Sequence, residues 1–522
     1  MATVLETVAP FSNEPVKTFA AAEDRMRMSA AMQAERARLG DHYDLIIGGR
    51  RVKSPEQFAS RNPAKPSEVV GMVQSATLEQ ASEAIAAADR AFVTWSTVQP
   101  QRRADLLFKT AAAVRQRRYE FDALLVLEVG KSWTEADGDV AEGIDFLEYY
   151  GREMLRYGGE HPVTPVRGEK NAMHYVPLGA GIVVPPWNFP FAIMVGMTAA
   201  AIVTGNTIVL KPSSDAPVIA ARFVDLLEQC GLPAGVVNLL TGSGGAIGDA
   251  LVVDPRVRFV SFTGSKDVGL RINELAAKPQ PGQKWIKRVI AEMGGKDSIV
   301  VAADADLDDA VEGVTVSAYG YGGQKCSACS RAIVEEPLYD RFIEKLVARV
   351  SKITVGDPGD PANYMGPVIN ERSLRKIEDY IAVGKSEGKL VAGGRRAGDG
   401  GYYMEPTVFA DVPPDGKLAQ EEIFGPVLAV IKAHNFDDAI AIANNTEFGL
   451  TGSVYSEDRH KLDRARKEFF VGNLYLNRKC TGALVGAHPF GGFNMSGTDS
   501  KAGGPDYLLL FLQAKLVSEK IG

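Results

Sequence analysis

Two of the chain's four cysteines, Cys326 and Cys329, lie in the stretch GYGGQKCSACSR at residues 320–331. A C-x-x-C pair can be half of a zinc site, a dithiol redox pair, one nucleophile beside a bystander, or two structural cysteines. Lys325 precedes Cys326, and a neighbouring cation lowers a thiol pKa and favours the reactive thiolate. The residues alone favour a single nucleophile at Cys326 over a redox pair, and they leave a buried structural cysteine equally open.

Residues that bind metals are not grouped in the sequence. The six histidines are scattered singly, and no second C-x-x-C accompanies the first. Cys230 and Cys480 are not spaced as zinc ligands. We therefore expect no metal site.

Two glycine-rich turns could approach a phosphate. TGSGGAIG at 241–248 misses the dinucleotide pattern G-x-G-x-x-G by one position, because Ile247 stands where the third glycine belongs. FTGSKDVG at 262–269 follows an apolar strand and opens a helix near Gly264, and the N–H groups at such a helix start can hold a phosphate. A tight turn that simply requires glycine is equally consistent with the second pattern.

The elements that must position these residues alternate between strand and helix from residue 181 onward. Apolar strands and helices follow one another through GIVVPP, FAIMVGMTAAAIVTG, NTIVLKPS, APVIAARFVDLLEQCG, GVVNLLTG, GAIGDALVVD and RVRFVSFTG. This order predicts a parallel sheet covered by helices on both faces, with ligands at the carboxyl ends of its strands. A second α/β series begins near Lys287 and runs past Leu476, with helices expected at 305–319, 338–353 and 435–444.

Residues before 160 and after 505 follow other sequence patterns. Helical spacing of apolar residues predicts amphipathic helices within 20–39 and 76–157, and DLIIGGRRV at 44–52 predicts a hairpin. The stretch 506–520 alternates like a strand for much of its length. A strand at a chain end commonly pairs with another subunit or with an internal sheet edge.

The totals indicate a soluble protein of two or three domains, with 522 residues, 45% apolar and 24% charged. A net charge of −7 without a dense Lys/Arg run argues against a nucleic-acid surface. Few cysteines and no signal-peptide pattern indicate a reducing, cytoplasmic location. No charge occurs between Val176 and Leu210, but prolines divide this stretch into pieces too short to span a membrane.

Six ordered motifs resemble the aldehyde dehydrogenase superfamily: PWNFP (186–190), FTGS (262–265), EMGGKD (292–297), GQKCSA (323–328), QEEIFGPV (420–427) and PFGGFNMSG (489–497). The resemblance covers about residues 45–515 and implies an α/β fold with a Rossmann-like NAD(P)-binding domain, a catalytic domain and a small β oligomerisation arm. The stretches at 128–150, 320–331 and 473–493 are similar to one branch, the monofunctional bacterial 1-pyrroline-5-carboxylate dehydrogenases.

The resemblance also implies how the chain divides. We expect an N-terminal helical extension at 1–40 and an NAD(P)-binding domain at 41–291, interrupted near 155–175 by part of the oligomerisation arm. The catalytic domain would follow at 292–488, and a C-terminal segment at 489–522 would include the oligomerisation strand.

For catalysis the resemblance assigns three residues. Cys326 would attack the aldehyde carbon, and the Asn188 amide with the Cys326 N–H would hold the resulting oxyanion. Glu292 would activate the water that hydrolyses the thioester. Without the resemblance, Asn188 could be a turn residue and Glu292 an exposed acid at a strand end.

For the cofactor, NAD, the resemblance implies eight residues, which are Pro186, Trp187, Lys211, Ser214, Gly264, Ser265, Glu422 and Phe424. Ser214 departs from the family pattern, in which members strict for NAD usually carry Glu at this position. A neutral hydroxyl does not repel a 2′-phosphate, so NADP is also expected to be accepted.

The implied substrate is L-glutamate γ-semialdehyde, formed when 1-pyrroline-5-carboxylate opens. Its α-carboxylate needs a cation, a hydroxyl and free N–H groups, and the resemblance supplies Lys325, Ser327, Gly482 and Ala483. Phe189 and Phe490 would pack on the aliphatic stem, although plain core packing would explain both. Glu142 is expected to orient Lys325.

Other functions remain open. A dehydrogenase for another semialdehyde, either succinate semialdehyde-like or CoA-acylating, would keep the cysteine, and a non-catalytic NAD-binding scaffold would keep only the fold. The expected partners are the small-molecule substrate, a separate proline dehydrogenase that supplies it, and further copies of the same chain, with neither nucleic acid nor a membrane among them.

Overall fold

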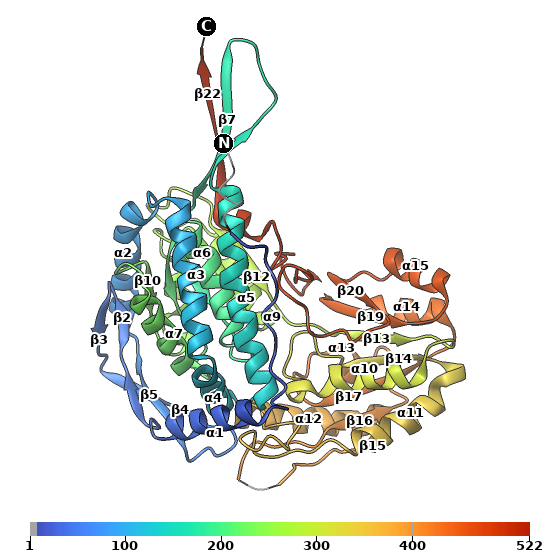
Figure 1. Cartoon of the computed structure of the whole chain (residues 1–522). Helices are drawn as coiled ribbons and strands as arrows, with labels where there is room; N and C mark the ends of the chain where they lie inside the picture. The colour runs from blue at the N-terminus through green and yellow to red at the C-terminus, as the bar shows by residue number, and fades with distance from the viewer. Residues whose placement is uncertain (1–7, 399, 522) are drawn as a thin grey trace.

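The computed structural model describes residues 8–398 and 400–521 (Figure 1). Two seven-stranded sheets lie side by side, each with helices packed against it, and a narrow β arm projects from the first. The chain enters through an extended segment and α1 (Ala22–Arg36), which lie against the helices of the first half. Helix within 20–39 is confirmed.

The first sheet has the strand order β12-β11-β8-β9-β10-β2-β3. Its strands are β2 (Leu45–Ile47), β3 (Arg50–Val52), β8 (Ala180–Val184), β9 (Thr207–Leu210), β10 (Val237–Leu239), β11 (Phe259–Thr263) and β12 (Arg288–Glu292). β8 to β12 pair in parallel, and β2 and β3 form the expected hairpin. Strand and helix alternate here as the sequence predicts.

Successive residues of these strands enter different cores, as the two-residue period of a strand requires. Val183 and Ile208 point into a core shared with the long helices, whereas Ile182 and Val209 point into a core on the other face. Both faces are therefore buried, which explains the apolar composition. The covering helices are α2 (Leu78–Trp95), α3 (Pro100–Gln116), α4 (Arg118–Val129), α5 (Trp133–Tyr157), α6 (Ala192–Val203), α7 (Pro217–Gln229), α8 (Gly244–Val253) and α9 (Lys266–Ala277).

The strand order reverses at β8, which has β9 on one side and β11 on the other. The loop after β8 and the loop after β11 therefore diverge and leave a crevice at the carboxyl edge of the sheet. PWNFP at 186–190 and FTGS at 262–265 occupy these two positions.

The second sheet has the order β15-β16-β17-β14-β13-β19-β20, parallel except at β15. Its strands are β13 (Ser298–Val301), β14 (Arg331–Glu335), β15 (Lys389–Ala392), β16 (Thr407–Ala410), β17 (Val427–Ala433), β19 (Thr451–Tyr455) and β20 (Asn473–Leu476). The helices of this half are α10 (Leu307–Tyr319), α11 (Glu336–Val350), α12 (Glu371–Glu387), α13 (Lys417–Gln420), α14 (Phe436–Asn444) and α15 (Arg459–Glu468). The three helices expected at 305–319, 338–353 and 435–444 are confirmed.

Smaller strands complete the molecule. β1 (Asp41–Tyr43), β4 (Glu56–Arg61) and β5 (Val69–Ser75) form one small sheet, and β18 (Phe448–Gly449) pairs with β21 (Phe493–Asn494). The arm consists of β6 (Glu160–Pro162), β7 (Glu169–Pro177) and β22 (Leu512–Lys520), with β22 running antiparallel to β7 over nine residue pairs. The strand expected within 506–520 therefore begins only at Leu512, after a 3₁₀ turn (Tyr507–Phe511).

The uncharged stretch from Val176 to Leu210 forms the end of β7, then β8, α6 and β9. None of the helices in the described part of the chain is long and apolar enough to cross a membrane.

Candidate active site

Cys326 follows a backbone turn that only glycine-rich sequence can make. After α10 the chain has three successive residues with left-handed φ, namely Tyr321 at 52°, Gly322 at 62° and Gly323 at 69°. A Cβ on Gly323 would lie 2.3 Å from the carbonyl oxygen of Gly425. The turn thus packs directly on the second sheet's loops and leaves the Cys326 side chain half-buried at its end.

The environment of the Cys326 thiol raises its pKa. Burial is the main cause, and the nearby carboxyl groups of Asp297, Glu422 and Glu292 add to it. The predicted lowering by Lys325 is wrong, because the Lys325 Nζ lies 2.7 Å from a Glu135 carboxylate oxygen and pairs with it. Adjacency in sequence did not bring the cation to the sulfur.

Asn188 reaches the cysteine turn from the first sheet. It lies in the loop after β8, is 4% exposed, and donates from Nδ2 to the Gln324 carbonyl oxygen at 3.1 Å. The bond ties PWNFP to the backbone two residues before Cys326. An amide nitrogen has a second N–H, and this geometry leaves it available to an oxyanion.

Glu292 ends β12 inside a shell of backbone and hydroxyl groups. Its Oε1 accepts the Ser500 hydroxyl, and the Ser500 N–H at 3.3 Å, whereas Oε2 is buried without a hydrogen-bond partner among the described residues. Glycines 491 and 497 of the PFGGFNMSG motif press on the carboxyl group, since added Cβ atoms would come within 2.9 and 3.1 Å of its oxygens. Burial raises the Glu292 pKa to about 7, so this group can take up or release a proton near neutrality.

The six motifs meet at this point. A Cβ on Gly295 of EMGGKD would lie 2.6 Å from the Cys326 carbonyl oxygen, and the Gly295 N–H donates to Glu422 at 3.1 Å. Burial also raises the Glu422 pKa. The nucleophile, its base candidate and Glu422 therefore lie around one point between the two sheets.

Lys211, predicted for the cofactor, ends the turn after β9 and is buried. Burial lowers its pKa to about 8, and within the part of the chain that the structure describes its Nζ donates only to the Pro212 carbonyl oxygen, at 3.5 Å. Ser214 lies nearby in the same loop and donates to the Gly242 carbonyl oxygen at 3.0 Å. A poorly satisfied ammonium beside a hydroxyl fits the ribose hydroxyls of a dinucleotide.

The remaining cofactor candidates line the crevice. Gly264 donates its N–H to the Glu292 carbonyl oxygen at 3.0 Å, and Ser265 stands at the N-cap of α9. The rings of Trp187 and Phe424 meet edge to face at 5.5 Å, with Phe424 at a left-handed φ of 61°. Pro186 is half-buried beside Trp187.

A cluster of lysines surrounds Glu135 close to Cys326. Burial alone would raise the Glu135 pKa, but Lys325, Lys131 and Lys479 outweigh it and lower the pKa. Lys131 is fully buried, with Nζ 3.6 Å from the Phe189 ring centre and 3.1 Å from an Asp139 carboxylate oxygen. Of this cluster the sequence predicted only Lys325, although EVGKSWTEAD at 128–137 contains Lys131 and Glu135.

The role predicted for Glu142 is wrong in one respect: Glu135, and not Glu142, pairs with Lys325. Glu142 lies two helical turns further along α5, where burial, with Asp139 next in importance, raises its pKa to about 8. A protonated Glu142 has no charge with which to orient a lysine.

The loop at residues 481–488, here called the carboxylate loop, carries Gly482 and Ala483. Arg478 donates to the carbonyl oxygens of Thr481 and Gly482 at 3.1 and 3.2 Å and so fixes the start of this loop. Among residues 8–398 and 400–521, neither the Gly482 nor the Ala483 N–H has a protein acceptor. Two free N–H donors near a lysine cluster suit a carboxylate.

Ser327 and Phe490 lie at the edges of the same region. Ser327 is 9% exposed, and its carbonyl oxygen accepts a bond of 3.4 Å from the Cys480 thiol, one residue before the carboxylate loop. Phe490 is half-buried and pairs through its backbone with Ala502. Ser327 and the carboxylate loop therefore adjoin through Cys480, which follows Lys479 of the lysine cluster in the chain.

Cys329 is buried in the core of the second half, as are most cysteines without a chemical role. Its side chain contacts Cys480, and all four cysteines of the chain are free. In the described residues, no group of three or more His, Cys, Asp and Glu side chains could hold a metal ion.

Comparison with known proteins agrees with this geometry. The sequence profile of the aldehyde dehydrogenase family matches residues 51–517. The chain is 56% identical to the 1-pyrroline-5-carboxylate dehydrogenase of Geobacillus thermodenitrificans (strain NG80-2) over 512 residues, covering 98% of this chain and 99% of that protein.

Two solved structures are also similar. The 1-pyrroline-5-carboxylate dehydrogenase from Thermus with bound NAD has a TM-score of 0.97 and 50% identity, covering 98% of this chain and all of that one. Proline utilization A from Bdellovibrio bacteriovorus, inactivated by N-propargylglycine, has a TM-score of 0.97 and 45% identity. That match covers 98% of this chain and 53% of the longer one.

Proposed function

The chain belongs to the aldehyde dehydrogenase family, and from this premise we propose that it oxidises L-glutamate γ-semialdehyde to L-glutamate with NAD. The single observation that carries the choice of substrate is the lysine cluster beside the nucleophile. Lys131, Lys325 and Lys479 surround Glu135, close to a loop with two unpaired N–H donors. An aldehyde with a distant carboxylate complements that arrangement.

The reaction uses residues from both sheets. The Cys326 thiol releases its proton to solvent and its sulfur bonds to the aldehyde carbon, whose carbonyl oxygen becomes an oxyanion beside the Asn188 amide and the Cys326 N–H. Bound NAD supplies the acceptor for the hydride that this tetrahedral carbon releases. Glu292 then removes a proton from water, which attacks the thioester and returns the thiol to Cys326.

The cofactor site is built by the loops at the carboxyl edge of the first sheet. Lys211 and Ser214 would hold the adenosine ribose, Gly264 and Ser265 the pyrophosphate, and Glu422 with Phe424 the nicotinamide end. The Ser214 hydroxyl, which donates to the Gly242 carbonyl oxygen, supports acceptance of NADP as well, since a neutral hydroxyl does not repel a 2′-phosphate.

The experiment is steady-state formation of reduced cofactor from 1-pyrroline-5-carboxylate and from succinate semialdehyde, each with NAD and NADP. We expect 1-pyrroline-5-carboxylate with NAD to give the highest kcat/KM. A higher value with succinate semialdehyde would contradict the proposed substrate. Stimulation of the rate by added CoA would instead indicate an acylating enzyme, and NAD binding without turnover would indicate a scaffold.

Two partners belong to the proposal. The substrate would come from a separate proline dehydrogenase, which is consistent with the longer proline utilization A chain, of which this chain matches about half. Copies of this chain would associate through the arm, where β22 lies at the sheet edge with Leu516 and Val517 exposed.

A further inference from the structure

The N-terminal segment at residues 9–19, here called the strap, runs along one face of α5 (Figure 1). Its contacts with this helix follow helical spacing: the Ala9 carbonyl oxygen accepts from Arg152, the Phe11 ring meets Tyr149 at 5.1 Å, and Asn13 donates to Asp145 at 2.8 Å. Further along, the Lys17 N–H donates to Asp137 at 2.6 Å, and the Phe19 ring meets Trp133 at 5.4 Å. The strap thus has a fixed register on the helix.

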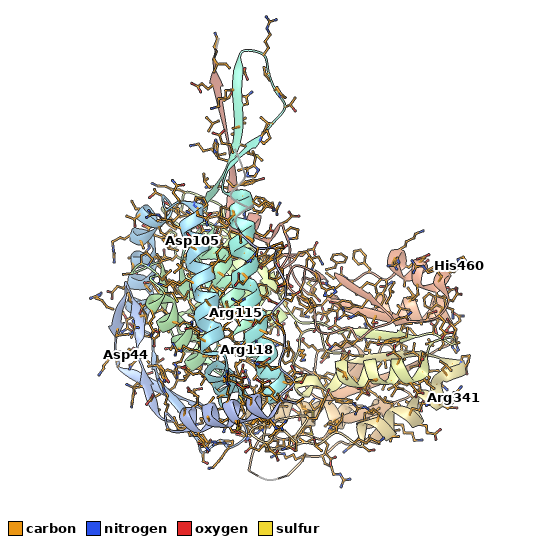
Figure 2. All side chains as sticks on the ribbon, viewed as in Figure 1. Asp44, Asp105, Arg115, Arg118, Arg341 and His460 are labelled. Atoms are coloured by element: carbon orange, nitrogen blue, oxygen red, sulfur yellow. The ribbon has the colours of Figure 1, made fainter. Side chains whose placement is uncertain are left out.

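Charged side chains hold the strap in this register, and one of them, Arg118, is buried. Glu14 pairs with Arg115 at 2.8 Å and with Arg118 at 3.1 Å, and these two arginines come from α3 and α4 beside α5 (Figure 2). Arg118 also donates to the Pro15 carbonyl oxygen at 2.7 Å. The Arg118 side chain is 6% exposed and the Arg115 side chain 38%, so Arg118 is the partner that is shielded from solvent.

At Phe11 and Asn13 the strap contacts the carboxylate loop as well as α5. Asn13 donates from Nδ2 to the Val485 carbonyl oxygen at 2.9 Å, as well as to Asp145. The Phe11 ring covers Gly486, the residue after Val485. A Cβ added to Gly486 would come within 3.1 Å of that ring. Gly486 has a left-handed φ of 78°, so the loop turns at the point where the strap covers it.

Other contacts also fix the carboxylate loop. Arg478 donates to the Thr481 and Gly482 carbonyl oxygens at 3.1 and 3.2 Å and lies 3.3 Å from a ring nitrogen of His488. Tyr149 of α5 faces Gly486, where an added Cβ would come within 3.1 Å of its ring. On one side the Gly486 N–H donates to the Gly503 carbonyl oxygen at 2.8 Å, and within the loop the Leu484 N–H donates to His488 at 3.1 Å. Gly482 and Leu484 are exposed. Asn13 and Phe11 therefore contact the middle of the loop together with Tyr149 of α5, the helix that also carries Glu135.

We propose that the strap braces the carboxylate loop, and that Asn13 is a positioning residue that sets the affinity for the carboxylate end of the substrate. Asn13 bonds both α5, through Asp145, and the loop, through Val485, so it fixes the distance between the loop's N–H groups and the lysine cluster. It touches neither the substrate nor the nucleophile. This inference rests on the proposed function, because it requires a substrate carboxylate at the loop.

The test compares Asn13→Ala with the unaltered protein on two aldehydes, L-glutamate γ-semialdehyde and the carboxylate-free pentanal. Loss of the Asn13 bonds is expected to raise KM for glutamate semialdehyde by about five-fold, the effect of one typical hydrogen bond, with kcat nearly unchanged. KM for pentanal is expected to stay the same. The inhibition constant of L-glutamate is expected to rise by the same factor as the first KM.

Lys17→Ala is the matched control. Its side chain pairs with Asp24 at 2.9 Å within the N-terminal region and does not touch the loop. We expect no change in the ratio of the two KM values. Phe11→Leu is the second loop variant, and it should change KM in the same direction as Asn13→Ala.

If Asn13→Ala changes KM equally for both aldehydes, or for neither, the proposal that the strap braces the carboxylate loop is overturned. Lys17→Ala with the same effect as Asn13→Ala would also overturn it, because general loosening of the strap would then explain the result. The unaltered protein tests the proposed function separately: equal kcat/KM on the two aldehydes before any substitution would contradict that function itself.

Discussion

At the scale of single residues, Cys326 and Glu292 share a site in which burial favours the protonated form of both. Deacylation requires Glu292 without its proton, so kcat is expected to fall as pH drops below about 7, approaching ten-fold per pH unit. The profile of kcat against pH measures this limb. A kcat that stays level down to the ordinary pKa of 4.5 would exclude Glu292 as the base.

The raised pKa of Glu292 also affects the free energy of unfolding, which falls as pH rises, whereas kcat rises. A folded-state pKa raised from 4.5 to about 7 means that the folded protein loses stability as pH rises through this interval. Glu292→Gln removes the buried charge, and above pH 7 it should increase the free energy of unfolding by on the order of 2 kcal/mol while abolishing turnover. Thermal unfolding at several pH values measures the difference, and a variant less stable at every pH would contradict this account.

The two cysteines of the C-x-x-C pair should differ sharply. Cys326→Ala is expected to abolish turnover, whereas Cys329→Ala should leave kcat within a few-fold, because Cys329 is 1% exposed and its neighbour is Cys480. The measurement is kcat with both variants folded, as judged by circular dichroism. Comparable losses in the two would argue for a dithiol mechanism instead.

At the scale of elements, the turn before Cys326 is where backbone geometry and chemistry depend on each other. Gly323→Ala places a Cβ 2.3 Å from the Gly425 carbonyl oxygen at a φ of 69°. The turn must shift, so both the melting temperature and kcat are expected to drop, the latter by at least about ten-fold. Gly282→Ala is the matched control, because Gly282 has a φ of 82° with open space around it, and it should lose only about 1 kcal/mol and no activity. Equal behaviour of the two variants would contradict the role of the turn.

Helices and strands were easier to predict than the contacts between side chains. Apolar runs bounded by turn residues predicted β8 to β11 and the helices between them, because burial on both faces of a sheet dictates such runs. Glu135 and Glu142 show the limit, since a spacing of seven residues places both on the same side of α5. Which of them reaches Lys325 depends on how the helix lies against the second half, and that is a property of the tertiary structure. The prediction of a lowered Cys326 pKa failed for the same reason, because Lys325 pairs with Glu135 in the tertiary structure.

At the scale of the whole molecule, the arm ends in an edge that the monomer does not cover. Leu516 is 62% exposed and Val517 43%, on a nine-residue strand at the edge of its sheet. We expect the protein to self-associate, and Leu516→Asp to shift light-scattering mass toward the monomer. Val93→Asp, at a 70% exposed position on α2, is the control and should leave the mass unchanged. An unaltered protein that is monomeric at micromolar concentration would contradict the proposed interface.

The contact between Asn13 and Val485 joins residues 472 positions apart in the chain. During synthesis, the first of these residues leaves the ribosome long before the second is made. The strap can lie on α5 early, but its bond to the carboxylate loop cannot form until almost the whole chain has been synthesised. Closing so long a loop is slow compared with forming local helices, so this bond should be among the last to form in folding. A nearly complete chain that ends before the loop would hold the nucleophile and its base candidate, yet it would lack the part that recognises the substrate.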